Sequence, residues 1–518
     1  MSKRLSSFLN AIPVISVSGN ADPEISSLAY DSRKVLPGAL FFALPGLHAD
    51  GARFIPQAVA SGAKAVVHAG TLPAESGYAE PGVVYVRVED PRFAMSPLSA
   101  AFHDHPSRDM AVVGVTGTEG KSTTVSLIFQ LLRLCGEKAG FISTVDYSLG
   151  GEVLPNPEHQ TTPEAVTIHE KLARMRESGC AYAVIESSSH GLSPRTNRLG
   201  DVLFDVGVMT NVTHEHLEFH GTHEQYKSDK ANLFRALDLH DHLKGGKQIP
   251  SFGVVNDEDP AASYFRAATK KPVYGFSTWA STKQGGLSAE SIEADAAGVF
   301  FKLNESGDRS YPVRINLPGA FNVRNVMATV IAVSGLLKKP VAEMVPLLPL
   351  LKPVAGRMTV VDQGQPFEVI VDYAHTPSSF QAVFPSLRKR IGGRIISLFG
   401  SGGERDTLKR PEQGRIAADY SDVIILADED PRGEDPVELL EMIAAGCPEK
   451  KRNEELYIIP NRPQAIRKAY SLAQPGDLVL LLGKGHENSI IYKDRTDPYD
   501  EIGEARTALA EMGYGGKK

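Results

Sequence analysis

The sequence predicts an α/β protein of three domains whose sheets are mostly parallel. A chain of 518 residues is longer than a single hydrophobic core usually serves, so its length favours about three domains. Short apolar runs, typical of buried parallel strands, end repeatedly in polar, glycine-rich segments. Proline-bearing stretches at 102–107 and 346–353 break the chain twice. We therefore expect domains at 1–107, 108–352 and 353–518.

The composition is that of a globular protein and excludes several classes of function. Apolar residues make up 42% of the chain and charged residues 23%, unlike disordered or fibrous proteins. A net charge of −7 provides no basic field for a phosphate backbone, so we expect no nucleic acid partner. The 3 cysteines form no C-x-x-C pair, which is typical of a reducing compartment. Since neither a signal peptide nor a run of about 18 apolar residues occurs, we expect a cytoplasmic protein without a membrane span.

The apolar runs of the central and C-terminal domains indicate where a ligand should bind. In open α/β sheets, ligands lie beyond the carboxyl ends of the strands. We therefore expect a Rossmann-like C-terminal domain, and a site whose residues come from two domains. The runs with their following segments are 182–185 before Glu186, 206–209 before 210–211, 395–399 before 400–403, 423–426 before Asp428, and 478–482 before 483–487.

A phosphate-binding loop follows the first expected strand of the central domain. Residues 114–122 read G-V-T-G-T-E-G-K-S and precede a segment with apolar residues at helical spacing. Glycines let backbone N–H groups converge on phosphate oxygens at the positive end of a helix. Lys121 offers a positive charge, and Ser122 offers a magnesium ligand. The motif predicts a central P-loop-type ATPase domain that binds ATP, with a chance glycine-rich turn as the alternative.

Residues 116–123 resemble the phosphate loop of the Mur ligases. That family usually has asparagine where this chain has Glu119. A carboxylate beside a triphosphate weakens binding unless it points outward or pairs with a cation. The resemblance assigns to the nucleotide Gly117, Thr118, Gly120, Lys121, Ser122 and Thr123.

Three further motifs occur in the order found in the Mur ligases. The resemblance implies that Glu186 and His216 bind Mg²⁺ together with Ser122, and that Lys230 carries a carbamate. An ammonium group near Mg²⁺ is repelled, whereas a carbamate is an anionic oxygen ligand. Taken alone, Lys230 would be interpreted as a solvated helix lysine and His216 as an ordinary histidine. The motifs are E-S-S-S-H at 186–190, T-N-x-x-x-E-H-L-E-x-H at 210–220, and Y-x-x-x-K-x-x-L-F at 226–234.

Two motifs suggest that the third domain closes over the nucleotide. Residues 319–325 resemble a family turn whose second asparagine, here Asn325, contacts adenine. A helix N-cap is the alternative for this residue. The resemblance further implies that Arg357 touches the phosphates and Asp372 the ribose. An arginine on a separate domain neutralises phosphoryl charge only after closure, so we expect domain motion.

Motifs of the N-terminal domain narrow the resemblance to Mur ligases of the MurE type. Segments 31–41 and 50–55 resemble the uridine-nucleotide domain of that type, and residues 159–164 resemble its substrate-binding T-T-P segment. The implied partner is a UDP-N-acetylmuramoyl dipeptide. The residues assigned to this substrate are Ser32, Thr161, Thr162, Ser188 and Arg198.

Motifs of the C-terminal domain resemble the amino-acid site of the same type. In members that add meso-diaminopimelate, an arginine, here Arg432, pairs with the distal carboxylate through a bidentate fork. Asp430 replaces an asparagine and would partly neutralise Arg432, which favours a distal ammonium, as on L-lysine or L-ornithine. We expect diaminopimelate, with the other two amino acids as alternatives. The residues assigned to the amino acid are Arg405, Asp430, Arg432, Gly483 and Glu487.

The resemblance implies an ATP-dependent, ADP-forming ligase of peptidoglycan precursor synthesis. A diamino acid would be joined to UDP-N-acetylmuramoyl-L-alanyl-D-glutamate through an acyl phosphate, with Lys121, Glu186, His216 and Lys230 as catalytic residues, and we expect a monomer. One alternative is a ligase like folylpolyglutamate synthase, which shares the ATP core but lacks the N-terminal uridine domain. Another is a non-catalytic nucleotide-binding regulator, which Glu119 would favour.

Overall fold

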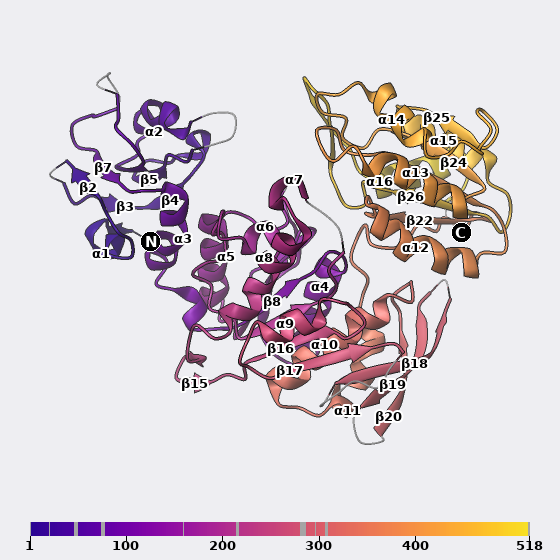
Figure 1. Cartoon of the computed structure of the whole chain (residues 1–518), viewed down its shortest axis with the longest axis horizontal. Helices are drawn as coiled ribbons and strands as arrows, with labels where there is room; N and C mark the ends of the chain where they lie inside the picture. The colour runs from indigo at the N-terminus through magenta and orange to yellow at the C-terminus, as the bar shows by residue number, and fades with distance from the viewer. Residues whose placement is uncertain are drawn as a thin grey trace.

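The computed structural model describes residues 2–19, 21–45, 50–73, 78–158, 160–213, 217–279, 286–295, 297–305 and 309–515. Sheets of five, eleven and six strands form the centres of three α/β units, which Figure 1 shows in indigo, magenta and orange to yellow. The predicted fold class is confirmed. Among the described residues, no helix is both long and apolar enough to cross a membrane.

The N-terminal sheet has the order β2-β7-β6-β5-β4, and its strands β4 to β7 are parallel. Apolar clusters lie on both faces of this sheet. The unit therefore has a core of its own. Its elements are β1 (Lys3–Arg4), α1 (Ser6–Leu9), β2 (Ser16–Ser18), β3 (Glu24–Ile25), β4 (Ser27–Ala29), the 3-10 helices η1 (Ser32–Lys34) and η2 (Gly51–Phe54), β5 (Ala39–Phe42), α2 (Ile55–Ala60), β6 (Ala65–His68), β7 (Val84–Arg87), α3 (Pro91–Phe102) and η3 (Pro106–Arg108).

The strands of the central sheet run parallel from β9 through β12, β8, β13, β16 and β17 to β18, and antiparallel strands extend both edges. Helices α4 and α10 cover one face, and α5 and α8 cover the other. The elements are β8 (Ala111–Thr116), α4 (Lys121–Leu134), β9 (Ala139–Ile142), β10 (Asp146–Ser148), β11 (Leu154–Pro155), α5 (Ala165–Glu177), β12 (Tyr182–Glu186), α6 (Ser189–Leu192), β13 (Val206–Met209), α7 (Leu217–His220), α8 (His223–Ala236), β14 (Leu243–Lys244), β15 (Lys247–Gln248), β16 (Phe252–Asn256), α9 (Ala262–Ala267), β17 (Val273–Ser277), β18 (Leu287–Ala294), β19 (Val299–Glu305), β20 (Arg309–Ile315), α10 (Asn322–Leu337), α11 (Val341–Met344) and η4 (Val345–Leu350).

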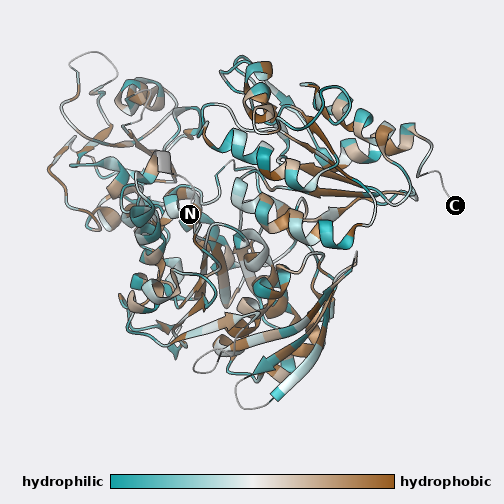
Figure 2. Cartoon of the chain, turned by 45° about the vertical axis from the view of Figure 1, so that its right-hand side comes forward, coloured by the Kyte–Doolittle hydropathy of each residue, from teal (hydrophilic) through white to brown (hydrophobic). Residues whose placement is uncertain are grey.

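The C-terminal sheet has the order β21-β22-β26-β23-β24-β25 and is parallel apart from β21. Helices α12 to α14 cover one face, and α15 and α16 cover the other. Figure 2 shows the strands of this sheet as largely hydrophobic, with hydrophilic residues on the covering helices. The elements are β21 (Thr359–Val360), β22 (Glu368–Asp372), α12 (Pro377–Arg390), β23 (Ile395–Phe399), α13 (Lys409–Tyr420), β24 (Val423–Leu426), α14 (Pro436–Ala444), β25 (Leu456–Ile458), α15 (Arg462–Leu472), β26 (Leu478–Leu482), β27 (Ser489–Ile491), β28 (Thr496–Pro498) and α16 (Glu501–Glu511).

Candidate active site

One cleft of about 920 Å³ lies between the central sheet and the C-terminal unit. Its walls include the phosphate loop, the ends of β12 and β13, the start of α10 and the loops after β22 and β24. Of the described residues that the sequence assigned to the site, all line this cleft except Ser32, Gly117 and Gly483. His216 lies outside the described residues. The C-terminal unit thus brings its assigned side chains to the phosphate loop.

The phosphate loop has the backbone that its glycines permit. Gly117 has a φ of 151° and Gly120 a φ of 82°, and helix α4 begins at the next residue, Lys121. A Cβ atom on Gly117 would lie 1.9 Å from the Thr210 hydroxyl, so only glycine fits there. The Lys121 ammonium donates to the Thr118 carbonyl at 2.7 Å. The predicted order of strand, loop and helix is therefore present.

Two of the expected magnesium ligands contact each other at the start of α4. Glu186 ends β12 and is buried, and its Oε1 accepts a hydrogen bond from the Ser122 hydroxyl at 3.0 Å. Its Oε2 accepts from the backbone N–H of Thr144 at 2.7 Å. Carboxylate and hydroxyl oxygens are ligands that Mg²⁺ prefers. This pair of side chains therefore fits the ion.

Lys230 is buried against the phosphate loop. The side chain extends from α8, its residue is 1% exposed, and Nζ donates to the Gly117 carbonyl at 2.6 Å. Nζ also lies 4.4 Å from the centre of the Tyr226 ring. The interpretation of this residue as a solvated helix lysine is therefore wrong. A buried amine at this position can reach groups bound in the cleft.

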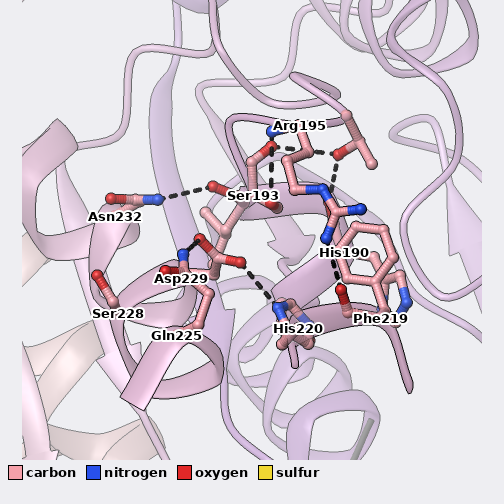
Figure 3. A network of polar contacts seen from close by, with 12 residues as sticks. His190, Ser193, Arg195, Phe219, His220, Gln225, Ser228, Asp229 and Asn232 are labelled. Atoms are coloured by element: carbon pink, nitrogen blue, oxygen red, sulfur yellow. Dashed lines mark hydrogen bonds and ion pairs between the residues drawn. The ribbon is translucent and has the colours of Figure 1, made fainter. Parts of the chain in front are cut away.

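A polar network that sequence reasoning missed holds the turn of α8 next to Lys230 (Figure 3). Nδ1 of His220 lies 2.8 Å from Oδ2 of Asp229, and Nε2 lies 3.0 Å from the Ser189 hydroxyl. Gln225 donates to the other oxygen of Asp229 at 2.9 Å. In the sequence, His220 is the last residue of the motif at 210–220, and Asp229 directly precedes Lys230. This adjacency to assigned residues is the sequence feature that could have predicted their role. The network fixes the rotation of α8, and with it the direction of Lys230.

Asn325 lies in the first turn of α10 beside the phosphate loop. Its Oδ1 accepts from the Thr124 hydroxyl at 3.3 Å, and its amide donates to the Asn322 side chain at 2.9 Å. The N-cap of α10 is Phe321, so Asn325 is not an N-cap. A Cβ atom on Gly120 would lie 2.6 Å from Oδ1 of Asn325, which shows how closely the loop approaches.

Arg357 brings the C-terminal unit into contact with the phosphate loop. Its Nη2 donates to the Ser122 hydroxyl at 3.4 Å, and its guanidinium lies 4.4 Å from the centre of the Tyr373 ring. Asp372 ends β22, is buried, and accepts from the N–H groups of Met358 and Ala374 at 2.7 and 2.8 Å. Burial raises the pKa of Asp372, and the charge of Arg357 opposes this rise.

The amino-acid end of the cleft differs from the expectation for Asp430. The buried Lys484 ammonium donates to Oδ1 of Asp430 at 2.9 Å and to Oε2 of Glu487 at 2.6 Å. Asp430 thus pairs with Lys484, and the described residues show no ion pair between Asp430 and Arg432. The expected neutralisation of Arg432 by Asp430 is therefore wrong. A lysine that lies 54 positions away along the chain takes up the charge of Asp430 instead.

Glu429 and Arg432 offer unpaired polar atoms of opposite charge at this end. Oε2 of Glu429 and Nε of Arg432 are buried and have no hydrogen-bond partner among the described residues. Burial raises the pKa of Glu429 to about 6, and Glu487 and Asp430 add to the rise while Lys409 and Lys484 oppose it. Gly483 lies behind this carboxylate, because a Cβ atom there would meet Oε2 of Glu429 at 2.6 Å.

Of the residues assigned to the UDP-N-acetylmuramoyl dipeptide, four line the cleft and the fifth, Ser32, lies in the N-terminal unit. The Thr162 hydroxyl donates to the Glu186 carbonyl at 2.8 Å and accepts from the Ser188 N–H at 2.9 Å. Arg198 donates to the Thr162 carbonyl at 2.9 Å, while Thr161 lines the cleft beside it. The Ser32 hydroxyl lies in the N-terminal unit and donates to the Gln57 side chain at 2.8 Å.

Comparison with known proteins gives a consistent result along the whole chain. Models of the Mur ligase family match as its catalytic domain at residues 24–103, its middle domain at 115–333 and its glutamate ligase domain at 356–485. A UDP-N-acetylmuramyl-tripeptide synthetase of Treponema denticola is 57% identical, over 98% of each chain. A UDP-N-acetylmuramoyl-L-alanyl-D-glutamate–2,6-diaminopimelate ligase of Geobacillus kaustophilus is 36% identical, over 98% of this chain and 100% of its own.

A solved structure of a UDP-N-acetylmuramoyl-L-alanyl-D-glutamate–2,6-diaminopimelate ligase superimposes with a TM-score of 0.62 at 27% identity, covering 98% of this chain and 99% of its own. The match at residues 24–103 covers the N-terminal unit that a folylpolyglutamate synthase was expected to lack. Relatives of this similarity span nearly all of the chain. The chain therefore belongs to the Mur ligase family, whose members are ATP-dependent, ADP-forming ligases.

Proposed function

We propose that this chain is a MurE-type ligase, which joins a diamino acid to UDP-N-acetylmuramoyl-L-alanyl-D-glutamate in peptidoglycan precursor synthesis. The observation that carries the proposal is the cleft in which the phosphate loop, Glu186, Lys230 and Arg357 lie together with Glu487. The names of the relatives support the same reaction. Residues 1–107 would bind the uridine nucleotide, 108–352 ATP, and 353–518 the amino acid.

The reaction needs no protein nucleophile. The D-glutamyl carboxylate attacks the γ-phosphate of ATP, forming an acyl phosphate and releasing ADP. The uncharged amine of the incoming amino acid then attacks the acyl carbon, phosphate leaves, and the amine proton passes to solvent. Lys121 and Arg357 stabilise the negative charge on the transferred phosphoryl group, and the cleft supplies orientation.

Mg²⁺ bound by Ser122, Glu186 and His216 would neutralise phosphate charge. Lys230 serves this site as a carbamate. The ammonium would first lose a proton, and the neutral amine nitrogen would then add to CO₂ with loss of a second proton, so that a repelling cation becomes an anionic oxygen ligand. The burial of Lys230 beside the phosphate loop supports this role. The carbamate also requires the amine to be held near the metal ligands, and the network at Asp229 provides that constraint.

Several side chains bind and orient the substrates. Asn325 contacts adenine, and Asp372 binds the ribose. The nearness of Asn325 to Gly120 supports its position at the nucleotide. The residues Ser32, Thr161, Thr162, Ser188 and Arg198 bind the UDP-N-acetylmuramoyl dipeptide.

The added amino acid is meso-diaminopimelate, with L-lysine or L-ornithine as the alternative. A zwitterionic distal end satisfies both unpaired groups at the amino-acid end, its carboxylate binding Arg432 and its ammonium binding Glu429. Lysine or ornithine would satisfy only Glu429 and would leave Nε of Arg432 buried without a partner. Because Lys484 already pairs with Asp430, the positive charge of Arg432 remains available to a carboxylate.

The test is ADP release with ATP and UDP-N-acetylmuramoyl-L-alanyl-D-glutamate, with meso-diaminopimelate, L-lysine and L-ornithine supplied separately. We expect turnover with diaminopimelate, and we expect Arg432→Ala to abolish its advantage over lysine. A preference of the unmodified enzyme for lysine or ornithine would overturn the choice of amino acid. No ADP release with any of the three would overturn the proposed function itself.

A further inference from the structure

Glu119 extends from the phosphate loop to the C-terminal unit. Its Oε1 accepts a hydrogen bond from the Thr376 hydroxyl at 3.2 Å, across 257 positions of sequence. Thr376 is the N-cap of α12, the helix that follows β22 and its ribose-binding candidate Asp372. The side chain that departs from the family's phosphate-loop pattern therefore touches another domain.

The N-terminus of α12 is well suited to receive a carboxylate. The first turn of this 14-residue helix contains no acidic residue, although the positive end of a helix favours a negative charge. Thr376 and Ser379 form a capping box in which each backbone N–H donates to the other's hydroxyl oxygen. The Ser379 hydroxyl donates to the Thr376 carbonyl at 2.8 Å. The Thr376 hydroxyl lies within hydrogen-bond distance of Oε1 of Glu119 at 3.2 Å and of the hydroxyls of Ser378 and Ser379 at 3.0 and 2.9 Å. Of these three acceptors the carboxylate is the strongest, because it is charged.

The backbone of Glu119 is hydrogen-bonded to two side chains of the central unit. The N–H of Glu119 donates to the Asn211 side chain at 2.8 Å, and its carbonyl accepts from the Thr210 hydroxyl at 2.6 Å. Both partners follow β13 in the central sheet. A contact from this carboxylate to α12 therefore ties the C-terminal unit to the central sheet itself.

The contact of Arg357 with the phosphate loop is expected to change during the reaction. Arg357 donates to the Ser122 hydroxyl, a group assigned to the metal and nucleotide. We expect bound ATP to exchange that contact for one between Arg357 and phosphate. The Glu119–Thr376 contact involves neither an expected phosphate-binding nor an expected metal-binding atom. It can persist when the site is filled.

We propose that Glu119 is a positioning residue: its contact with Thr376 holds the C-terminal domain closed on the phosphate loop and so keeps Arg357 over the transferred phosphoryl group. This inference rests on the proposed function. It also explains how a carboxylate is tolerated beside a triphosphate, because the positive end of α12 offsets part of its negative charge. Removing it reduces the closed population and, at the same time, removes a negative charge near ATP.

The test compares the kinetics of Glu119→Asn, Glu119→Gln and a matched control, Glu152→Asn, which makes the same change at an exposed position of the central unit. Asparagine is one methylene shorter and does not reach Thr376, whereas glutamine keeps the reach and an acceptor oxygen. We expect kcat to fall about tenfold for Glu119→Asn and less for Glu119→Gln. The KM for ATP should stay constant or fall, since the repelling charge is gone. The control should match the unmodified enzyme.

A double-mutant cycle with Thr376→Ala separates the contact from the helix cap, which that substitution also removes. We expect Glu119→Asn to lower kcat when Thr376 is present. In the Thr376→Ala background the same substitution should leave kcat unchanged. Small-angle X-ray scattering with a non-hydrolysable ATP analogue should show a larger radius of gyration for Glu119→Asn than for Glu152→Asn.

An unchanged kcat for Glu119→Asn would overturn the inference while leaving the ligase assignment intact. The same holds if Glu119→Asn lowers kcat by the same factor with and without Thr376→Ala. A higher KM for ATP at constant kcat would do the same, because it would mean that Glu119 binds the nucleotide. Failure of the unmodified enzyme to release ADP with its substrates would instead count against the proposed function.

Discussion

The two ends of the cleft differ in how their carboxylates are prepared for a ligand. At the phosphate loop, both oxygens of Glu186 and the ammonium of Lys230 have hydrogen bonds within the protein, whereas Nε of Arg357 is buried without a partner among the described residues. At the amino-acid end, Asp430 and Glu487 pair with Lys484, but Oε2 of Glu429 and Nε of Arg432 are buried without a partner among the described residues. Burial also raises the pKa of Glu429 to about 6.

This difference suggests a division of labour within one cleft. Groups that serve ATP meet the same ligand in every turnover, and holding them in place beforehand lowers the barrier. Groups that choose an amino acid discriminate best when a wrong ligand leaves them buried and unpaired. Substitutions at the phosphate loop should therefore lower kcat, and substitutions at the other end should raise the KM for the amino acid. The predictions below test that contrast.

The largest effect is expected for Lys230→Ala, which removes both the contact to Gly117 and the proposed carbamate. We expect kcat for ADP release to fall about 10³-fold. Formate should restore part of the activity, because it supplies the missing anionic oxygens. Lys227→Ala, one turn away on α8, is the control and should retain activity. Lack of rescue together with normal folding would count against the carbamate.

Arg357→Ala should lower kcat about 10²-fold, since the guanidinium stabilises charge that develops on the phosphoryl group. Arg357→Lys should recover part of the loss, because it keeps the charge but not the stacking on Tyr373. Steady-state kinetics would check both variants against Arg314→Ala, which removes an exposed arginine of β20. If Arg357→Ala changed only the KM for the amino acid, the proposed difference between the two ends of the cleft would be contradicted.

Glu429→Gln should raise the KM for the amino acid about tenfold and leave the KM for ATP unchanged. The same variant should be the more stable protein at pH 8. The folded-state pKa of about 6 exceeds the ordinary 4.5, so this group stabilises the fold below pH 4.5 and loses that contribution as the pH rises through 6.

At pH 8 the advantage of Glu429→Gln should be about 2 kcal/mol, and it should disappear near pH 4.5. The charged groups facing Glu429 are Lys409, Lys484, Glu487 and Asp430, and their balance sets the size of the effect. Thermal unfolding between pH 5 and 8 measures it. If the difference in the free energy of unfolding between Glu429→Gln and the unmodified protein becomes smaller as the pH rises, this account of the amino-acid end is refuted.

The smallest effect is expected for Ser32→Ala in the N-terminal unit. Its hydroxyl bonds to Gln57 and does not line the cleft, so the loss of one neutral hydrogen bond should raise the KM for the UDP substrate about fivefold. The kcat and the KM for both other substrates should stay constant. Titration of the UDP substrate at saturating ATP would show whether the residue acts on this substrate alone.

Much of the fold could be predicted because its signals are local. The runs at 182–185, 206–209 and 478–482 lie in β12, β13 and β26, since an uninterrupted apolar run is stable only where both faces of a sheet are covered. The glycine spacing before Lys121 likewise predicted the strand, loop and helix, because this signal is also local. Backbone conformation at these positions depends on the residue and its near neighbours.

The pairing of side chains could not be predicted in this way. Lys230 meets the Gly117 carbonyl across 113 positions, and Asp430 meets Lys484 across 54. The sequence by itself determined the family, the three α/β units, the phosphate loop and most of the residues that line the cleft. Only the tertiary structure decided that Lys230 is buried, that Asp430 pairs with Lys484, and that Glu119 reaches Thr376. These contacts depend on which helix lies against which strand end. No local pattern of residues encodes that arrangement, because the partners lie far apart in the sequence.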